Sequence, residues 1–171
     1  MATAQKKSES PKKATKPQEA TALLRADHKM VSMLFEQYES ARSRPKKKAL
    51  ATQICTELTV HAQIEEEIFY PAVRAAIDDE DLLDEAEIEH ATAKDLIAQI
   101  EEMDASEDKY AARVIVLGEY IDHHVKEEQE EMFPKAMKAK LDMEALGEAI
   151  MARKEELKAE LGTEEEEETE A

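Results

Sequence analysis

The chain has 171 residues, room for one modest domain with tails, and its 37% charged residues, scarce Gly and missing Trp favour an all-α fold. The formal net charge of -18 argues against nucleic-acid binding by the folded body, and no apolar run approaches the roughly 20 residues that span a bilayer. Cys55 is the only cysteine and the N-terminus lacks the apolar centre of a secretory signal, so we expect a cytoplasmic protein without disulfides or membrane contact.

Residues 1–19 carry lysines among Ala, Ser, Thr and Pro, which predicts a disordered basic arm to which we assign no function. A helical pattern begins at Thr21, and Pro45, which suits a helix start, opens a second helix to Ala76. The inward faces are Leu24, His28, Val31 and Phe35 in the first helix, and Ile54, Leu58, His61, Glu65 and Ile68 in the second.

Two further helices follow the same pattern. The acidic cluster at residues 78–81 predicts a cap for a third helix to Met103, and Ser106 predicts a cap for a fourth to Lys138. Residues 139–162 form a C-terminal helical segment, and the glutamate-rich residues 163–171 are too charged to pack and read as a disordered acidic tail. The inward faces are Leu83, Ala86, His90, Ala93 and Ile97, then Leu117, Ile121, His124, Glu128 and Met132.

Short connections between four amphipathic helices over residues 20–138 predict an antiparallel up-down-up-down four-helix bundle. The ten-residue pattern from His61 to Pro71 recurs from His124 to Pro134, so the bundle consists of two matched helical hairpins. The repeat selects His124 rather than His123 as the inward residue, because it keeps the ten-residue distance to the proline and has Leu117 and Ile121 beside it. We therefore expect His123 to be exposed.

Glu65 and Glu128 fall on apolar stripes, where unpaired carboxylates are costly, so a positive group must lie between them. Two metal ions satisfy both glutamates, with neutral imidazoles as further ligands. This mixed ligation suits iron, and Mn or Zn are substitutes. For Tyr70-Pro71 and Phe133-Pro134 we favour packing and helix shaping. The predicted metal ligands are His28, His61, Glu65, His90, His124 and Glu128.

These segments resemble the hemerythrin-like family, whose members are described as HHE cation-binding domains. The resemblance rests on Asp27-His28, the residues from His61 to Glu66 with Tyr70-Pro71, Glu89-His90, and the residues from His124 to Glu128 with Phe133-Pro134. It implies a non-haem, oxo-bridged di-iron centre, with one iron on His28 and His61, the other on His90 and His124, and Glu65 and Glu128 bridging. Ferritin-like bundles instead place histidine three residues after glutamate.

One position departs from the pattern. Oxygen-carrying hemerythrins have a fifth histidine one turn after the third-helix ligand, and here that position is Lys94, whose ammonium has no lone pair for a metal. Either the second iron keeps an open or water-filled position, or another group such as Glu87 or Tyr120 fills it.

The resemblance leads to three functional hypotheses. The first is a di-iron protein that binds or senses O2 or a related small oxidant, and the second is an enzyme that processes peroxide or nitric oxide at the same irons. The third is a metal-dependent regulatory or iron-sensing module. Sensing would require a separate protein partner, because no output domain is recognisable in the sequence.

Overall fold

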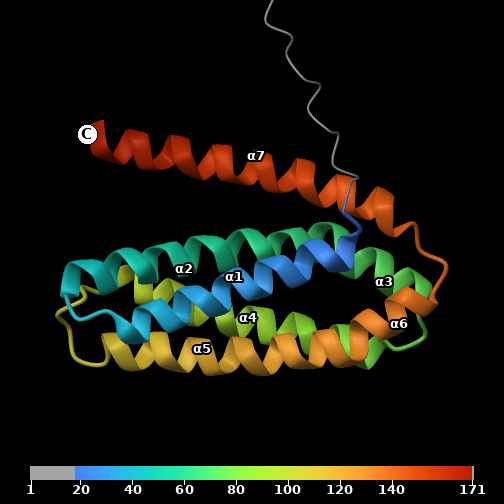
Figure 1. The fold of residues 1–171 in the computed structure, drawn as a ribbon, viewed down its shortest axis with the longest axis horizontal. Coiled ribbons are helices and arrows are strands. Elements are labelled where there is room, and N and C mark those ends of the chain that lie inside the picture. Colours follow the sequence, from blue (N-terminus) through green and yellow to red (C-terminus); the bar gives the residue numbers. More distant parts are fainter. Residues whose placement is uncertain (1–17, 171) are drawn as a thin grey trace, which may run out of the picture.

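The computed structural model describes residues 18–170, and the side chains of residues 18–162. Four long helices lie side by side as an antiparallel bundle: α1 (Ala20–Ser40), α2 (Arg44–Ile64), α4 (Glu80–Glu102) and α5 (Tyr110–Glu127) (Figure 1). The predicted all-α bundle is thereby confirmed. Most of the predicted basic arm lies outside the described residues. None of the helices in the described part is long and apolar enough to cross a membrane.

Each hairpin's second helix contains a π-helical turn that the sequence reading did not anticipate. In the first hairpin α2 continues through η1 (Glu65–Phe69) into α3 (Tyr70–Ala76), and in the second α5 continues through η2 (Glu128–Met132) into α6 (Phe133–Lys138). Pro71 and Pro134 are the second residues of α3 and α6, and proline disrupts α-helical bonding because it lacks an N–H and its ring crowds the preceding turn. The prolines therefore shape these helices, and each π turn begins at a predicted metal ligand.

Of the two predicted helix caps, the one in the acidic cluster at residues 78–81 is confirmed, and Ser43 supplies a cap that was not predicted. The Ser43 and Asp79 side chains accept hydrogen bonds from the backbone N–H groups of Lys46 and Leu82, both at 3.3 Å. The expected cap at Ser106 is wrong. Its backbone N–H and hydroxyl bond the Asp104 carboxylate at 2.9 and 2.8 Å, which folds a turn, and α5 begins only at Tyr110.

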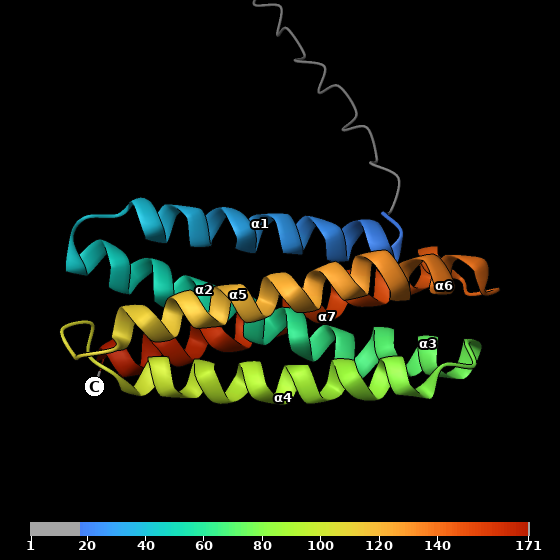
Figure 2. The ribbon, with the colours of Figure 1, turned by 90° about the horizontal axis from the view of Figure 1, so that it is seen from below.

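A fifth long helix, α7 (Met143–Glu170), lies outside the bundle against α1 and α2 (Figures 1 and 2). It extends beyond residue 162, so the backbone of residues 163–170 is helical where the sequence reading expected an acidic disordered tail. Ile150 and Leu157 of α7 are buried against the bundle. Gly147 permits the close approach, because a Cβ there would lie 2.2 Å from the backbone oxygen of Gln18.

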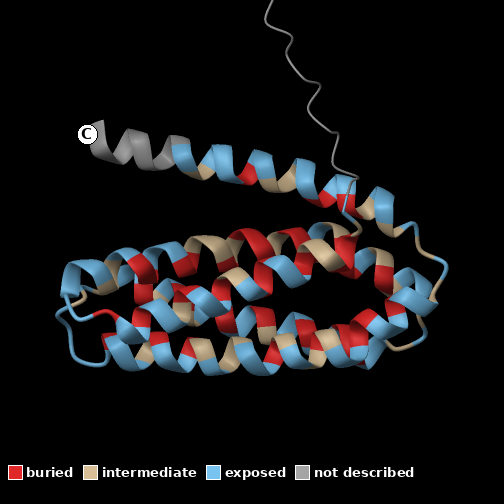
Figure 3. Ribbon diagram, viewed as in Figure 1, coloured by how far each residue is buried: buried red, intermediate tan, exposed pale blue. Residues whose placement is uncertain are grey.

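The buried core follows the inner sides of the helices (Figure 3). It forms two apolar clusters, one containing Leu24 and Ile64 and the other containing Val31 and Leu58. His28 and His61 lie between these residues along α1 and α2. The polar site therefore occupies the middle of the bundle, between the two apolar clusters.

Candidate metal centre

The structure brings all six predicted ligand residues together in the bundle interior. Glu65 and Glu128 are 0% and 2% exposed, and the four histidines are also buried. The residues form two groups whose ligand atoms lie within 4.8 Å of one another: His28, His61, Glu65 and Glu128, and then Glu65, His90 and His124.

Within each group the two imidazoles face each other. The Nε2 atoms of His28 and His61 are 3.1 Å apart, and those of His90 and His124 are also 3.1 Å apart. Two nitrogens that each lie about 2.1 Å from one ion, at roughly 90–110° to each other, are about 3.0–3.4 Å apart. The spacing of both pairs therefore fits a shared ion.

Both glutamates span the two groups. Glu65 contacts His61 with Oε1, while its Oε2 lies 3.5 Å from Nε2 of His90. Glu128 places Oε1 3.2 Å from Nε2 of His28 and Oε2 3.4 Å from Nε2 of His124. Each carboxylate thus presents one oxygen to each pair of histidines, which is the arrangement that bridging ligands require.

Hydrogen bonds on the outer nitrogens orient three of the rings. Nδ1 of His61 lies 3.0 Å from Oδ2 of Asp27, Nδ1 of His28 lies 2.9 Å from Oε1 of Gln129, and Nδ1 of His124 contacts Glu89. These oxygens are acceptors, so each Nδ1 carries a hydrogen. In the neutral imidazoles the Nε2 lone pairs then point inward, as in metal-bound histidines.

The inner oxygens lack hydrogen-bond donors. Among the described residues, both carboxylate oxygens of Glu65 and Oε1 of Glu128 are buried without a hydrogen bond. Buried carboxylates without donors are costly, and inward-facing imidazole lone pairs add to the negative potential. A cation between these groups removes both costs, so the donor set fits metal ions.

Without metal, protons supply part of this positive charge. Burial opposes the charged imidazoles of His61 and His124, but the nearby carboxylates outweigh it and raise the pKa of each to about 10. Burial likewise opposes the charge of Glu65, yet the neighbouring histidines hold the pKa of its carboxyl well below the usual range. Glu65 therefore stays ionised.

Tyr70, for which the sequence predicts only packing, lies inside the candidate site. Its hydroxyl donates a 2.6 Å hydrogen bond to Oε2 of Glu128 and lies 3.1 Å from Nε2 of His90 and 3.3 Å from Nε2 of His124. The matching residue of the other hairpin is Phe133, whose ring lies parallel to that of His28 with centroids 6.0 Å apart. The second half of the site thus has a phenol that the first half lacks. This difference between the two repeats is visible in the sequence and could have identified Tyr70 as a site residue.

The other residues discussed for the place of the missing fifth histidine do not contact the ligand nitrogens in this way. Lys94 forms an ion pair with both carboxylate oxygens of Glu66, and Oε1 of Glu66 is 3.8 Å from Nδ1 of His90. Glu87 points away and binds Arg74 at 2.9 Å. Tyr120 lines the cavity beside the site. His123 has 65% of its side chain exposed, as the repeat predicted.

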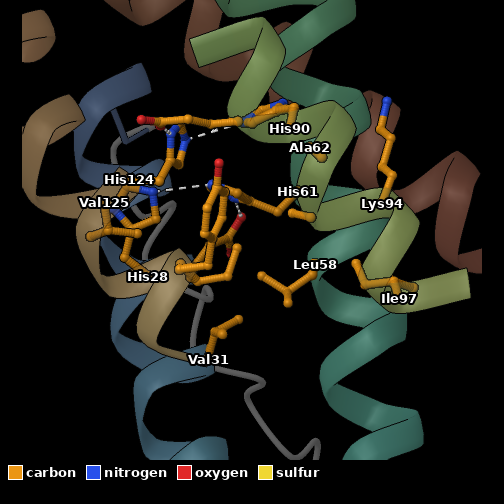
Figure 4. A pocket seen from close by; sticks show the side chains of 15 residues that line it. His28, Val31, Leu58, His61, Ala62, His90, Lys94, Ile97, His124 and Val125 are labelled. Carbon is orange, nitrogen blue, oxygen red and sulfur yellow. Dashed lines mark hydrogen bonds and ion pairs between the residues drawn. The ribbon is translucent and has the colours of Figure 1, made fainter. Parts of the chain in front are cut away.

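A small cavity of about 30 Å³ adjoins the four histidines. Its wall is largely apolar and includes Val31, Leu58 and Ile97, while the Lys94 side chain extends outward (Figure 4). About 10–15 Å³ of such volume holds one water molecule, so the cavity suits a molecule of two or three atoms.

Residues 19–136 match the family described as Hemerythrin HHE cation binding domain. The chain belongs to this family, and the resemblance seen in its sequence is confirmed. A crystal structure of a hemerythrin HHE cation binding domain-containing protein from Mycobacterium kansasii is similar, with a TM-score of 0.73 and 26% identity. The match covers 84% of this chain and 89% of that one.

A second relative is a protein named DNA nickase from Nostoc sp. (strain PCC 7120 / SAG 25.82 / UTEX 2576). It is 32% identical over 114 residues, which are 65% of this chain and 31% of the relative. The chain therefore spans about a third of the length of that protein.

Proposed function

We propose that the chain holds a non-haem di-iron centre that binds or senses O2 or a related small oxidant. The observation that carries this proposal is the arrangement of two facing imidazole pairs, each with Nε2 atoms 3.1 Å apart, linked by two buried carboxylates. Both oxygens of Glu65 and Oε1 of Glu128 have no hydrogen-bond donor among the described residues. A single ion bound at His28 and His61 would leave the His90–His124 pair and Oε2 of Glu65 without a positive partner.

The residues divide between two ions. His28 and His61 would hold the first ion, and His90 and His124 would hold the second, with Glu65 and Glu128 spanning both. Tyr70 would add a phenolic oxygen to the second ion, because its Oη lies within 3.3 Å of both Nε2 atoms of that half. The phenol thus takes up the role that Lys94 cannot perform.

The donor set favours iron among divalent ions. It combines imidazole nitrogen with carboxylate and phenol oxygen, and iron accepts both in sites that keep an exchangeable position. Manganese and zinc suit the same atoms, so the metal present in the cell depends on supply as well as geometry. When bound, iron supplies the one-electron redox steps that chemistry with O2, peroxide or nitric oxide requires.

The surrounding residues determine what reaches the centre. The apolar side chains of Val31, Leu58 and Ile97 admit a small uncharged molecule and disfavour anions, since a charge would lose its hydration there. Asp27, Gln129 and Glu89 keep three imidazoles in one orientation, and such partners strengthen ligand basicity.

A second candidate function, turnover of peroxide or nitric oxide, is supported by Tyr70. Its hydroxyl proton is held at Oε2 of Glu128, inside the site, where reduction of an oxidant would consume protons. Binding and turnover are distinguished by consumption of peroxide or nitric oxide. If iron-loaded protein consumes neither faster than an equal amount of free iron, the enzymatic alternative is abandoned.

Reversible binding is tested by spectroscopy. The metal-free protein is loaded with Fe²⁺ under argon, and optical spectra are recorded before air, after air and after renewed deoxygenation. Binding predicts an absorption band that appears with O2 and disappears when it is removed. Irreversible bleaching, or no change with O2, contradicts reversible binding.

A further inference from the structure

We propose a third cation site, on the outer surface of α4 and α5, formed by Glu89, His123 and Glu127 for one divalent transition-metal ion. The three residues offer ligand atoms that all lie within 4.8 Å of one another. Nε2 of His123 is 3.2 Å from Oε1 of Glu127. Solvent reaches the cluster, because the His123 side chain is 65% exposed and that of Glu127 is 37% exposed.

The matching place in the first hairpin already holds a cation. Glu89 and Asp27 are equivalent in the repeat, and each contacts the outer Nδ1 of a site histidine. Asp27 also forms an ion pair with the ammonium group of Lys154, which α7 supplies. Asp27 therefore binds its histidine with one oxygen and a cation with the other.

The second hairpin has ligand residues where the first has an apolar surface for α7. His123 and Glu127 are equivalent to Val60 and Ile64, which are buried in the same cluster as Ile150 and Leu157 of α7. Because α7 packs on α1, α2 and η1, it cannot bring Lys154 to Glu89. Instead a second carboxylate and an imidazole lie beside Glu89, and two neighbouring carboxylates repel each other unless a cation separates them.

The ligand types select the class of ion. One imidazole and two carboxylates suit Zn²⁺, Mn²⁺ or Fe²⁺, and water fills the remaining positions because the cluster is on the surface. Ca²⁺ and Mg²⁺ prefer oxygen ligands alone. An ion bound to Glu89 would also draw negative charge away from the hydrogen bond between Glu89 and His124. Through this hydrogen bond, the surface site is linked to the interior site.

The test counts bound Zn²⁺ in the full chain by equilibrium dialysis and metal analysis. We expect three ions in the unmodified protein and two in both His123→Ala and Glu127→Gln. The exposed carboxylate variant Glu36→Gln, which lies outside all three clusters, is expected to retain three. Because the His123 side chain is exposed, we expect His123→Ala to fold normally, and circular dichroism checks its helix content directly.

The result separates this site from the interior centre. Equal zinc content in the unmodified protein and His123→Ala overturns the third site, whether that content is two ions or three. If the unmodified protein binds fewer than three ions and His123→Ala loses one of them, the surface site stands and the two-ion interior centre fails. Anomalous diffraction from a zinc-loaded crystal should place the lost ion at Nε2 of His123; density only elsewhere would contradict the proposal.

Discussion

Lys154 of α7 forms an ion pair with Asp27, and the other oxygen of Asp27 lies 3.0 Å from Nδ1 of the site residue His61. The helix outside the bundle thus contacts a predicted metal ligand through one carboxylate. Burial would raise the pKa of Asp27, but the hydrogen bonds with His61 and Lys154 hold it below the usual value.

Replacement of Lys154 by methionine leaves the Asp27 carboxylate partly buried without its ammonium partner. We predict a loss of about 1–2 kcal/mol in the free energy of unfolding, between the values typical of surface and buried ion pairs. The matched control is Lys158→Met, which breaks the more exposed pair with Glu57 and should cost less than about 0.5 kcal/mol. Urea denaturation measures both, and equal losses would refute a special role for Lys154.

Gly147 tests the docking of α7 against the start of α1. A Cβ at this position would lie 2.2 Å from the backbone oxygen of Gln18, so Gly147→Ala must displace one of the two segments. We predict destabilisation by more than about 1 kcal/mol, in the range of overpacked cores. Gly162→Ala is the control: nothing lies within 4 Å, and alanine should stabilise the helix by up to about 1 kcal/mol. A melting temperature for Gly147→Ala at or above that of the unmodified protein would disprove the contact.

Tyr70 is predicted to bind the second iron through its phenol. Tyr70→Phe should keep its iron, because four histidines and two glutamates remain, but lose the visible absorption that a phenolate–iron(III) bond produces. Tyr120→Phe, which changes a residue of the cavity wall, should keep that absorption. Identical visible spectra of oxidised Tyr70→Phe and the unmodified protein would show that the phenol does not bind iron.

The metal-free protein should lose stability as pH rises above neutrality. The pKa values of His61 and His124 are about 10 in the folded chain and about 6.5 in an unfolded one, so folding favours their protonated forms. This stabilisation is fully present below about pH 6.5 and is lost as pH rises through about 10. Urea midpoints between pH 6.5 and 9.5 in chelator should therefore fall. His123→Ala should fall in parallel, and a flat or rising profile would contradict the assignment.

The repeat made much of the fold and the interior site predictable. His28 and His90, like His61 and His124, recur at nearly equal spacing, and their apolar neighbours at helical intervals fix which face points inward. The choice of His124 over His123 needed only this comparison, and the structure has His124 buried and His123 exposed.

The features that were not predicted depend on contacts between distant segments. Tyr70 and Phe133 occupy equivalent positions in the repeat, yet only Tyr70 has a hydroxyl, which contacts His90 and Glu128. The spacing of apolar residues does not predict these contacts. Likewise Ser106 has the residue type of a cap, but Asp104 competes for its hydrogen bonds. The ion pair of Lys154 with Asp27 joins residues 127 positions apart, and no local pattern indicates it.

The most direct test of the two-ion centre is the iron content of purified protein loaded anaerobically, compared with that of single-residue variants. We predict about two iron ions per chain in the unmodified protein and in His123→Ala when loosely held surface iron is removed by a mild chelator. His61→Ala and His124→Ala, which each remove one of a facing pair of imidazoles, should lose the iron. One ion per chain in the unmodified protein, or full loading of His124→Ala together with iron loss in His123→Ala, would contradict the account.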